Sequence, residues 1–198
     1  MTRIVVISGG LGTPSSTRVL GDDIAARLRE ALALNGQELD LETVELRELA
    51  HPIADAMLTG FPTGELARIV DEVAAADALV VVSPTFSASI SGLVKSFFDV
   101  LEPDTLAGKP VLMAATGGTE RHSLMIEFAM RPLFSYLGAV PVRTGIFAAT
   151  SDFGGPGAAS LSRRVARGAQ ELADALTGTA TKPREDDFVE FAALLGAR

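Results

Sequence analysis

Short runs of β-branched and apolar residues alternate along this chain with segments of helical periodicity, and this alternation limits the possible folds more than any other feature. Buried strands are predicted at residues 4–7, 78–82 and 111–115, each followed by a loop rich in glycine, serine or proline. An edge strand is predicted at 39–46 and a last strand at 140–149. Helices are predicted between Thr17 and Gly36 and at 65–76, 90–101, 122–137 and 161–176.

Strands that alternate with helices form a parallel sheet, because each strand is joined to the next by a right-handed crossover. The sequence therefore predicts an α/β fold, a doubly wound five-stranded parallel sheet in the order 2-1-3-4-5 with helices on both faces. In such a sheet, ligands bind outside the carboxyl ends of the strands, where the strand order reverses. The unusual loops of this chain follow those strand ends.

The predicted domain covers residues 1–177. Residues 178–198 are predicted to be a tail with a short amphipathic helix, because Phe188, Phe191 and Leu195 form a narrow apolar stripe. The stretch from His51 to Gly64 is predicted to be a loop, since it contains proline and glycine. The tail and this loop are the expected contacts of a homodimer or homotetramer.

Composition and charge exclude several classes of function. The 198 residues carry 17 Lys and Arg against 25 Asp and Glu, a net charge of −8, so neither nucleic acid nor a membrane surface is an expected partner. The absence of cysteine excludes disulfides, thiol nucleophiles and Cys-ligated metals. No apolar run approaches the ~20 residues of a membrane span, and no signal peptide is recognised, so a cytoplasmic protein is expected.

The first buried strand leads into a glycine-rich loop, residues 8–18 (SGGLGTPSSTR). A glycine-rich turn before a hydroxyl-capped helix presents backbone N–H groups and the positive end of the helix dipole, an arrangement that binds anions. The candidate binding residues are Ser8, Gly9, Ser15, Ser16, Thr17 and Arg18. A Walker lysine is absent, and the dinucleotide fingerprint is only half met. The alternative interpretation is an ordinary capped helix after a flexible turn.

The loop after the second buried strand combines an aromatic side chain with small hydroxyl residues. Its candidate binding residues are Pro84, Thr85, Phe86 and Ser87. A flat aromatic ring flanked by small residues suits a planar ligand ring that lies against the backbone. The alternative is that Phe86 only covers the end of the sheet.

The third loop presents backbone with few side chains at Thr116, Gly117 and Gly118, where the polar edge of a ligand could reach N–H and C=O groups. His122 follows and could bond a ligand or a nicotinamide, although a histidine at a helix start is more often a surface residue. Neither histidine has the spacing of a metal site, so no metal is expected. A nucleophile elbow of the form G-x-S-x-G is also absent.

Together the three loops describe a phosphate-binding end, a stacking surface and a contact for a polar edge, which is the shape of flavin mononucleotide (FMN). The motifs SGG…SSTR, SPTFSASISGLVKSFFDVL and ATGG…H resemble those of the flavodoxin-like NAD(P)H-dependent FMN reductases. The resemblance is greatest to the alkanesulfonate-type flavin reductases, which supply two-component monooxygenases. The family's phosphate loop is matched at Gly9, Ser15, Thr17 and Arg18, whereas its serine and first arginine fall on Gly10 and Gly12.

This resemblance implies a flavodoxin-like fold and hydride transfer from NADPH or NADH to FMN, with a flavin-dependent monooxygenase as a possible partner. No side chain is predicted to be catalytic, because the cofactors carry the hydride chemistry. Arg121 is the predicted contact for the 2′-phosphate of NADPH. The alternatives are a flavodoxin-like electron carrier, an in-place quinone or azo reductase, and a non-enzymatic nucleotide-binding module.

Overall fold

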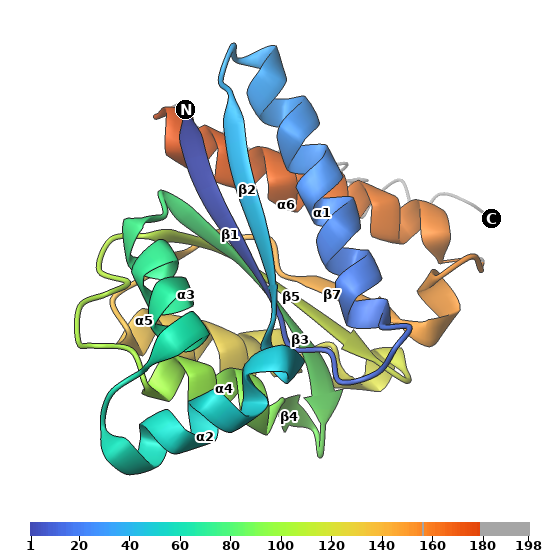
Figure 1. Ribbon diagram of the computed structural model, residues 1–198. Helices are drawn as coiled ribbons and strands as arrows, with labels where there is room; N and C mark the ends of the chain where they lie inside the picture. The colour runs from blue at the N-terminus through green and yellow to red at the C-terminus, as the bar shows by residue number, and fades with distance from the viewer. Residues whose placement is uncertain (156, 179–198) are drawn as a thin grey trace, which may run out of the picture.

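The computed structural model describes residues 1–155 and 157–178, so the predicted tail helix lies outside the described residues. A mostly parallel sheet forms the centre of the described part, with helices on both of its faces (Figure 1). The strands are β1 (Thr2–Ser8), β2 (Leu39–Glu45), β3 (Ala78–Phe86), β4 (Ser89–Ile90), β5 (Pro110–Gly117), β6 (Val140–Pro141) and β7 (Ile146–Ala149). The predicted α/β class is confirmed.

The sheet has the order β2-β1-β3-β5-β6, and β7 also pairs with β5. The prediction of five strands is wrong, because the described residues form seven. The predicted last strand is broken into β6 and β7, both parallel to β5. Between them, Arg131 donates to the carbonyl oxygens of Val142 and Arg143, and the Thr144 N–H donates to Glu171 at 2.7 Å. Side chains thus take the place of ladder partners there.

The β3 strand is longer than predicted and turns back into β4. Ser87 and Ala88, between the two strands, both have positive φ, at 47° and 63°. This pattern is typical of a two-residue type I′ hairpin turn. The hairpin extends β3 beyond the sheet and carries Phe86 with it.

The longer helices are α1 (Ser16–Leu34), α2 (Ala50–Thr59), α3 (Gly64–Ala75), α4 (Gly92–Asp99), α5 (Arg131–Tyr136) and α6 (Ala158–Thr177). Short 3-10 helices are η1 (Leu46–Leu49), η2 (Glu120–His122) and η4 (Thr150–Asp152), and η3 (Ile126–Met130) is a π-helix. The predicted helix at 122–137 is therefore divided into η2, η3 and α5.

The predicted loop at 51–64 is wrong, since α2 occupies most of it. Ile53 and Ala56 lie one helical turn apart and are both buried. Pro52 is tolerated because it lies in the first turn, where the backbone N–H has no partner within the helix. The helix ends at Gly60, which has a φ of 88°.

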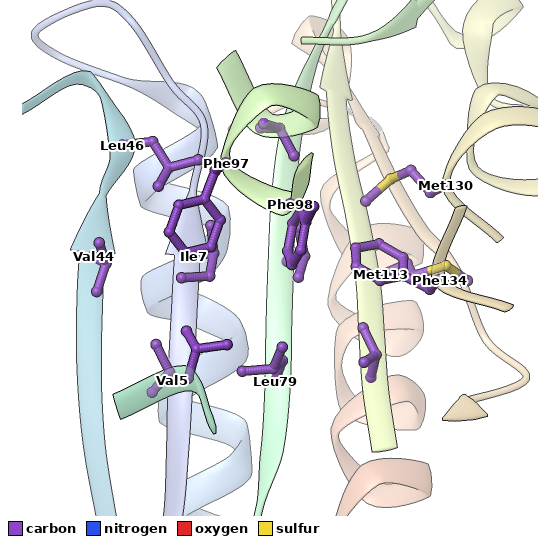
Figure 2. Packing of buried hydrophobic residues seen from close by; sticks show 14 of the residues in the cluster. Val5, Ile7, Val44, Leu46, Leu79, Phe97, Phe98, Met113, Met130 and Phe134 are labelled. Atoms are coloured by element: carbon purple, nitrogen blue, oxygen red, sulfur yellow. The ribbon is translucent and has the colours of Figure 1, made fainter. Parts of the chain in front are cut away.

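Each face of the sheet buries its own apolar core. Alternate residues of β1 point to opposite faces: Val5 and Ile7 face α2 to α5, and Ile4 and Val6 face α1 and α6. Figure 2 shows the first of these cores, in which the rings of Phe98 and Phe134 meet edge to face at 4.9 Å. These residues are fully buried, so the strands and the loops that leave them have fixed positions.

Candidate functional site

The three predicted loops lie together at the carboxyl ends of β1, β3 and β5 (Figure 1). In the sheet register, Ser8 of β1 lies beside Val82, and Pro84 of β3 lies beside Thr116. The Gly9 N–H also donates to the Val82 carbonyl oxygen at 2.9 Å, directly beyond the end of the β1 ladder. The sheet therefore brings the three groups of candidate residues into one place.

The β1–α1 loop, residues 9–15, is held tightly in place. A Cβ atom at Gly9 would lie 2.2 Å from Cγ2 of Val94, and one at Gly10 would lie 2.1 Å from Oγ of Ser15. Ser15 is the N-cap of α1, and its Oγ accepts from the Arg18 N–H at 3.2 Å. The predicted helix cap is confirmed. At positions 9 and 10 a Cβ atom would collide with these neighbours, so both positions favour glycine.

A buried hydrogen bond joins the first loop to the third. Oγ1 of Thr17 and Oγ1 of Thr116 are 2.9 Å apart, and both side chains are buried. These two hydroxyls therefore satisfy each other and fix the start of α1 against the end of β5.

Two other buried hydroxyls at the strand ends have no such partner. Among the described residues, neither Oγ of Ser8 nor Oγ1 of Thr85 makes a hydrogen bond. A buried hydroxyl without a partner costs about 1–3 kcal/mol, so both atoms are candidates for bonds to a bound molecule. Both residues were predicted from sequence.

The second and third loops are more open. Phe86, at the end of β3, is 45% exposed as a residue. A Cβ atom at Gly117 would lie 2.8 Å from the Phe147 ring, whereas one at Gly118 would meet nothing within 4 Å. The Gly118 backbone and the Phe86 ring thus face solvent. The unpaired hydroxyl of Thr85 lies close by, since its Oγ1 would be 3.5 Å from a Cβ atom at Gly117.

A cavity of about 300 Å³ joins the β3–β4 turn to the third loop. Ala88 and Ser89 line it together with Arg121 and His122. Its remaining lining residues are Leu124, Met125, Phe128 and Ala129. The structure therefore places the predicted His122 and Arg121 next to the second loop.

The Arg18 side chain is directed to two carboxylates. Its Nε lies 2.9 Å from Oδ1 of Asp22, and its Nη1 lies 2.9 Å from Oε1 of Glu45. Hydrogen bonding to Asp22, together with the charges of both carboxylates, raises the pKa of Arg18 above its ordinary value. This guanidinium is thus neutralised by neighbours within the chain.

Arg47, in η1 directly after β2, was not predicted from sequence. It donates through Nη1 to Oγ1 of Thr13 in the β1–α1 loop, and its Nε lies 3.0 Å from Oε2 of Glu45. In the sheet register Glu45 lies beside Ser8, where that loop begins. Because β2 pairs with β1, the residues that directly follow β2 lie near the β1–α1 loop. That pairing is the signal that could have indicated Arg47.

A larger cavity, of about 430 Å³, lies beyond β7 and contains none of the predicted residues. It is lined by Glu120, Ser123, Ile126, Glu127, Gly145, Phe147, Ser151, Asp152 and Arg164. Arg164 is held there by the Phe147 carbonyl oxygen at 3.1 Å and by Oδ2 of Asp152 at 3.3 Å. Its charge is therefore already compensated.

Comparison with known proteins identifies the family of this chain. The model of the family described as NADPH-dependent FMN reductase matches residues 2–154. The chain belongs to this family. It is an NAD(P)H-dependent FMN reductase, as the sequence motifs predicted. The matched range contains all three loops.

Two relatives from Pseudomonas are named for different coenzymes, NADPH and NADH. An FMN reductase (NADPH) of Pseudomonas aeruginosa is 38% identical over 76% of this chain and 78% of its own length. An NADH-dependent FMN reductase, SfnF, of Pseudomonas fluorescens is 36% identical over 91% of this chain and 95% of its own.

Solved structures support the same fold. An oxidoreductase from Corynebacterium diphtheriae superposes with a TM-score of 0.87 at 47% identity, covering 91% of this chain and 99% of that one. A flavodoxin from the domain Archaea has a TM-score of 0.57 at 17% identity, covering 89% and 99%, which confirms the flavodoxin-like fold. Across residues 1–155 and 157–178, no helix is both long and apolar enough to span a bilayer.

Proposed function

We propose that this reductase binds FMN across the carboxyl ends of β1, β3 and β5 and reduces it there with a nicotinamide dinucleotide. The observation that carries this proposal is the combination of tightly placed glycine backbone with two buried, unpartnered hydroxyls, Ser8 and Thr85, at adjacent strand ends. A planar ligand with one phosphate would supply the missing partners at this end of the sheet.

The phosphate end of the site is proposed to be the β1–α1 loop and the first turn of α1. The helix start at Ser15 and Ser16 would present N–H groups to the anion, whereas the N–H of Gly9 is bonded to Val82 and fixes where the loop begins. Thr17 contributes indirectly, since its hydroxyl is bonded to Thr116. The predicted contact of Arg18 with the phosphate would compete with the pairing of its guanidinium to Asp22 and Glu45.

The ring end is proposed to lie between the β3–β4 hairpin and the third loop. Phe86 would stack on the flavin, flanked by Pro84 and Ser87, while the backbone of Gly117 and Gly118 would bond its polar edge. The cavity beside His122 would receive the nicotinamide. Bound FMN supplies the hydride-accepting chemistry, and the protein aligns the rings and excludes water.

The proposed partner is a flavin-dependent monooxygenase that takes up reduced FMN. The exposure of the Phe86 ring supports release of the flavin, because a half-exposed stacking surface does not enclose its ligand. An oligomer is also proposed, since the segment that contains η3 and α5 exposes Leu124, Phe128 and Tyr136. Light scattering tests it: a mass of two or four chains is expected, and the mass of one chain would contradict it.

Reductase activity is tested by following the oxidation of NADH and of NADPH with and without added FMN. Oxidation that requires FMN and saturates with it is expected for at least one of the two coenzymes. If neither coenzyme is oxidised while FMN binds tightly, the chain would instead be an electron carrier. If FMN neither binds nor is reduced, the proposed site is wrong.

A further inference from the structure

The β1–α1 loop has no positive side chain of its own. From Gly9 to Thr17 the sequence contains glycine, leucine, threonine, proline and serine, and the whole chain has a net charge of −8. A phosphate bound there would depend on backbone N–H groups and on cations from outside the loop. Two arginines next to the loop are candidates for this role, Arg18 on α1 and Arg47 on η1.

These two arginines share one carboxylate. Oε1 of Glu45 is 2.9 Å from Nη1 of Arg18, and Oε2 of Glu45 is 3.0 Å from Nε of Arg47. The Glu45 side chain is only 17% exposed, so its charge is weakly screened by solvent. Asp22 holds the other side of the Arg18 guanidinium.

Arg47 is the arginine that reaches the loop. Its Nη1 donates to Oγ1 of Thr13, in the middle of the loop. Its Nε is buried and has no hydrogen-bond partner among the described residues, because its N–H is not aligned with the nearby carboxylate of Glu45. The third nitrogen of Arg47, Nη2, lies 3.6 Å from Oε1 of Glu48. Arg47 thus contacts the loop directly and keeps one unbonded donor there. The Arg18 guanidinium is bonded through Nε to Asp22 and through Nη1 to Glu45, and among the described residues no hydrogen bond joins it to the loop.

We propose that Arg47 is the cation that binds the flavin phosphate in this chain, and that Glu45 is an internal anion with which the phosphate competes. This inference rests on the proposed function. When the phosphate is bound, Arg47 keeps its place beside Thr13 and bonds a phosphate oxygen, and its interaction with Glu45 weakens. Removing the charge of Glu45 therefore makes both arginines more available.

The test compares FMN with riboflavin, which lacks the phosphate, by quenching of flavin fluorescence. Arg47→Ala is expected to weaken FMN binding about 10-fold to 100-fold, the range for a charge-assisted hydrogen bond, with riboflavin binding unchanged. Arg47→Lys is expected to restore part of the loss. Glu45→Gln is expected to tighten FMN binding several-fold, because the phosphate no longer competes with a carboxylate for the two arginines.

A matched control is Arg68→Ala. Arg68 also pairs with a β2 carboxylate, Glu42, at 2.7 Å, but it bonds Glu65 of α3 and makes no contact with the loop. It is expected to leave the affinity for both flavins unchanged. This control separates a local phosphate contact from a general change in charge.

Several outcomes would overturn the inference while leaving the proposed function intact. Arg47→Ala would do so if it left FMN binding unchanged or weakened FMN and riboflavin equally, since the arginine would then be irrelevant or merely hold the loop. A wild type that binds both flavins equally would also contradict it. Weaker FMN binding in Glu45→Gln would overturn the role of Glu45. Failure of the wild type to bind either flavin or to oxidise NAD(P)H would instead reject the proposed function.

Discussion

The β1–α1 loop and the pair of loops after β3 and β5 lie at the same end of the sheet but differ in how tightly they are held. In the first, Gly9 and Gly10 leave no room for a Cβ atom, Ser15 caps the helix, and Thr17 is bonded to Thr116. In the other two, Phe86 and the backbone of Gly118 are open to solvent, and Gly117, whose Cβ position would lie 2.8 Å from the Phe147 ring, is the tightly packed exception.

This difference indicates a division of roles. Backbone N–H groups can hold a small, strongly charged phosphate only if they already point in the right directions, so the phosphate end benefits from rigidity. A flavin that is reduced and released, and that must share its face with a nicotinamide, needs an accessible surface. The predictions below test whether tight packing is confined to the first loop.

The largest effect is expected at Gly9. Gly9→Ala places a methyl group against Val94 and Pro84 in the buried start of the loop, and it should destabilise the fold by about 1–3 kcal/mol. Gly118→Ala is the matched control in the open loop, where nothing lies within 4 Å, and it should be near neutral. Urea unfolding measures both. Equal costs at the two positions would remove the contrast between the loops.

The bond between the first and third loops comes next. Thr17→Val leaves the hydroxyl of Thr116 buried without a partner, which should cost about 1–2 kcal/mol of unfolding free energy. The double variant Thr17→Val, Thr116→Val should recover part of that loss, because no unpaired hydroxyl remains. Strictly additive losses in a double-mutant cycle would show that the two loops are not coupled through this bond.

Phe86 tests the open side of the comparison. Phe86→Ala should change the unfolding free energy by less than about 0.5 kcal/mol, because the ring is half-exposed. It should weaken FMN binding by about 0.5–1.5 kcal/mol through the loss of stacking. Phe86→Tyr retains the ring and serves as the control in the same fluorescence titration. A large loss of stability with unchanged flavin affinity would assign the ring to the core.

The smallest effect is expected at Arg121, in the cavity beside His122. Arg121→Ala should raise the KM for NADPH roughly two- to fivefold, the range for an exposed charge pair, and should leave the KM for NADH unchanged. Steady-state kinetics with both coenzymes measure it. If both KM values rise together, Arg121 does not contact the 2′-phosphate.

The fold and the positions of the three loops could be predicted because both depend on local sequence. Residues 4–7 of β1 are a continuous apolar run followed by Ser8 and Gly9, and Ser15 is a strong helix cap at the right position. The helix α2 was missed because Pro52 and Gly60 were interpreted as loop residues, although one lies in the first turn and the other ends the helix.

Other features depend on residues far apart in the sequence. The break between β6 and β7 requires Glu171 and Arg131, which bond the backbone at Thr144 and Val142 from two different helices. Arg47 reaches the first loop only because β2 lies beside β1. No periodicity or local motif contains this information, since it arises from the pairing of distant elements.

Amide hydrogen exchange with and without FMN tests most directly whether one flavin binds across all three loops. Slower exchange is predicted within residues 9–17, 84–91 and 117–122 when FMN is bound. No change is predicted at the end of α3, where Glu72 lies 3.5 Å from Arg3 at the start of β1, away from the loops. Riboflavin should protect the second and third segments but not the first. Protection confined to the cavity around Arg164, or no protection at all in the three loops, would contradict the account.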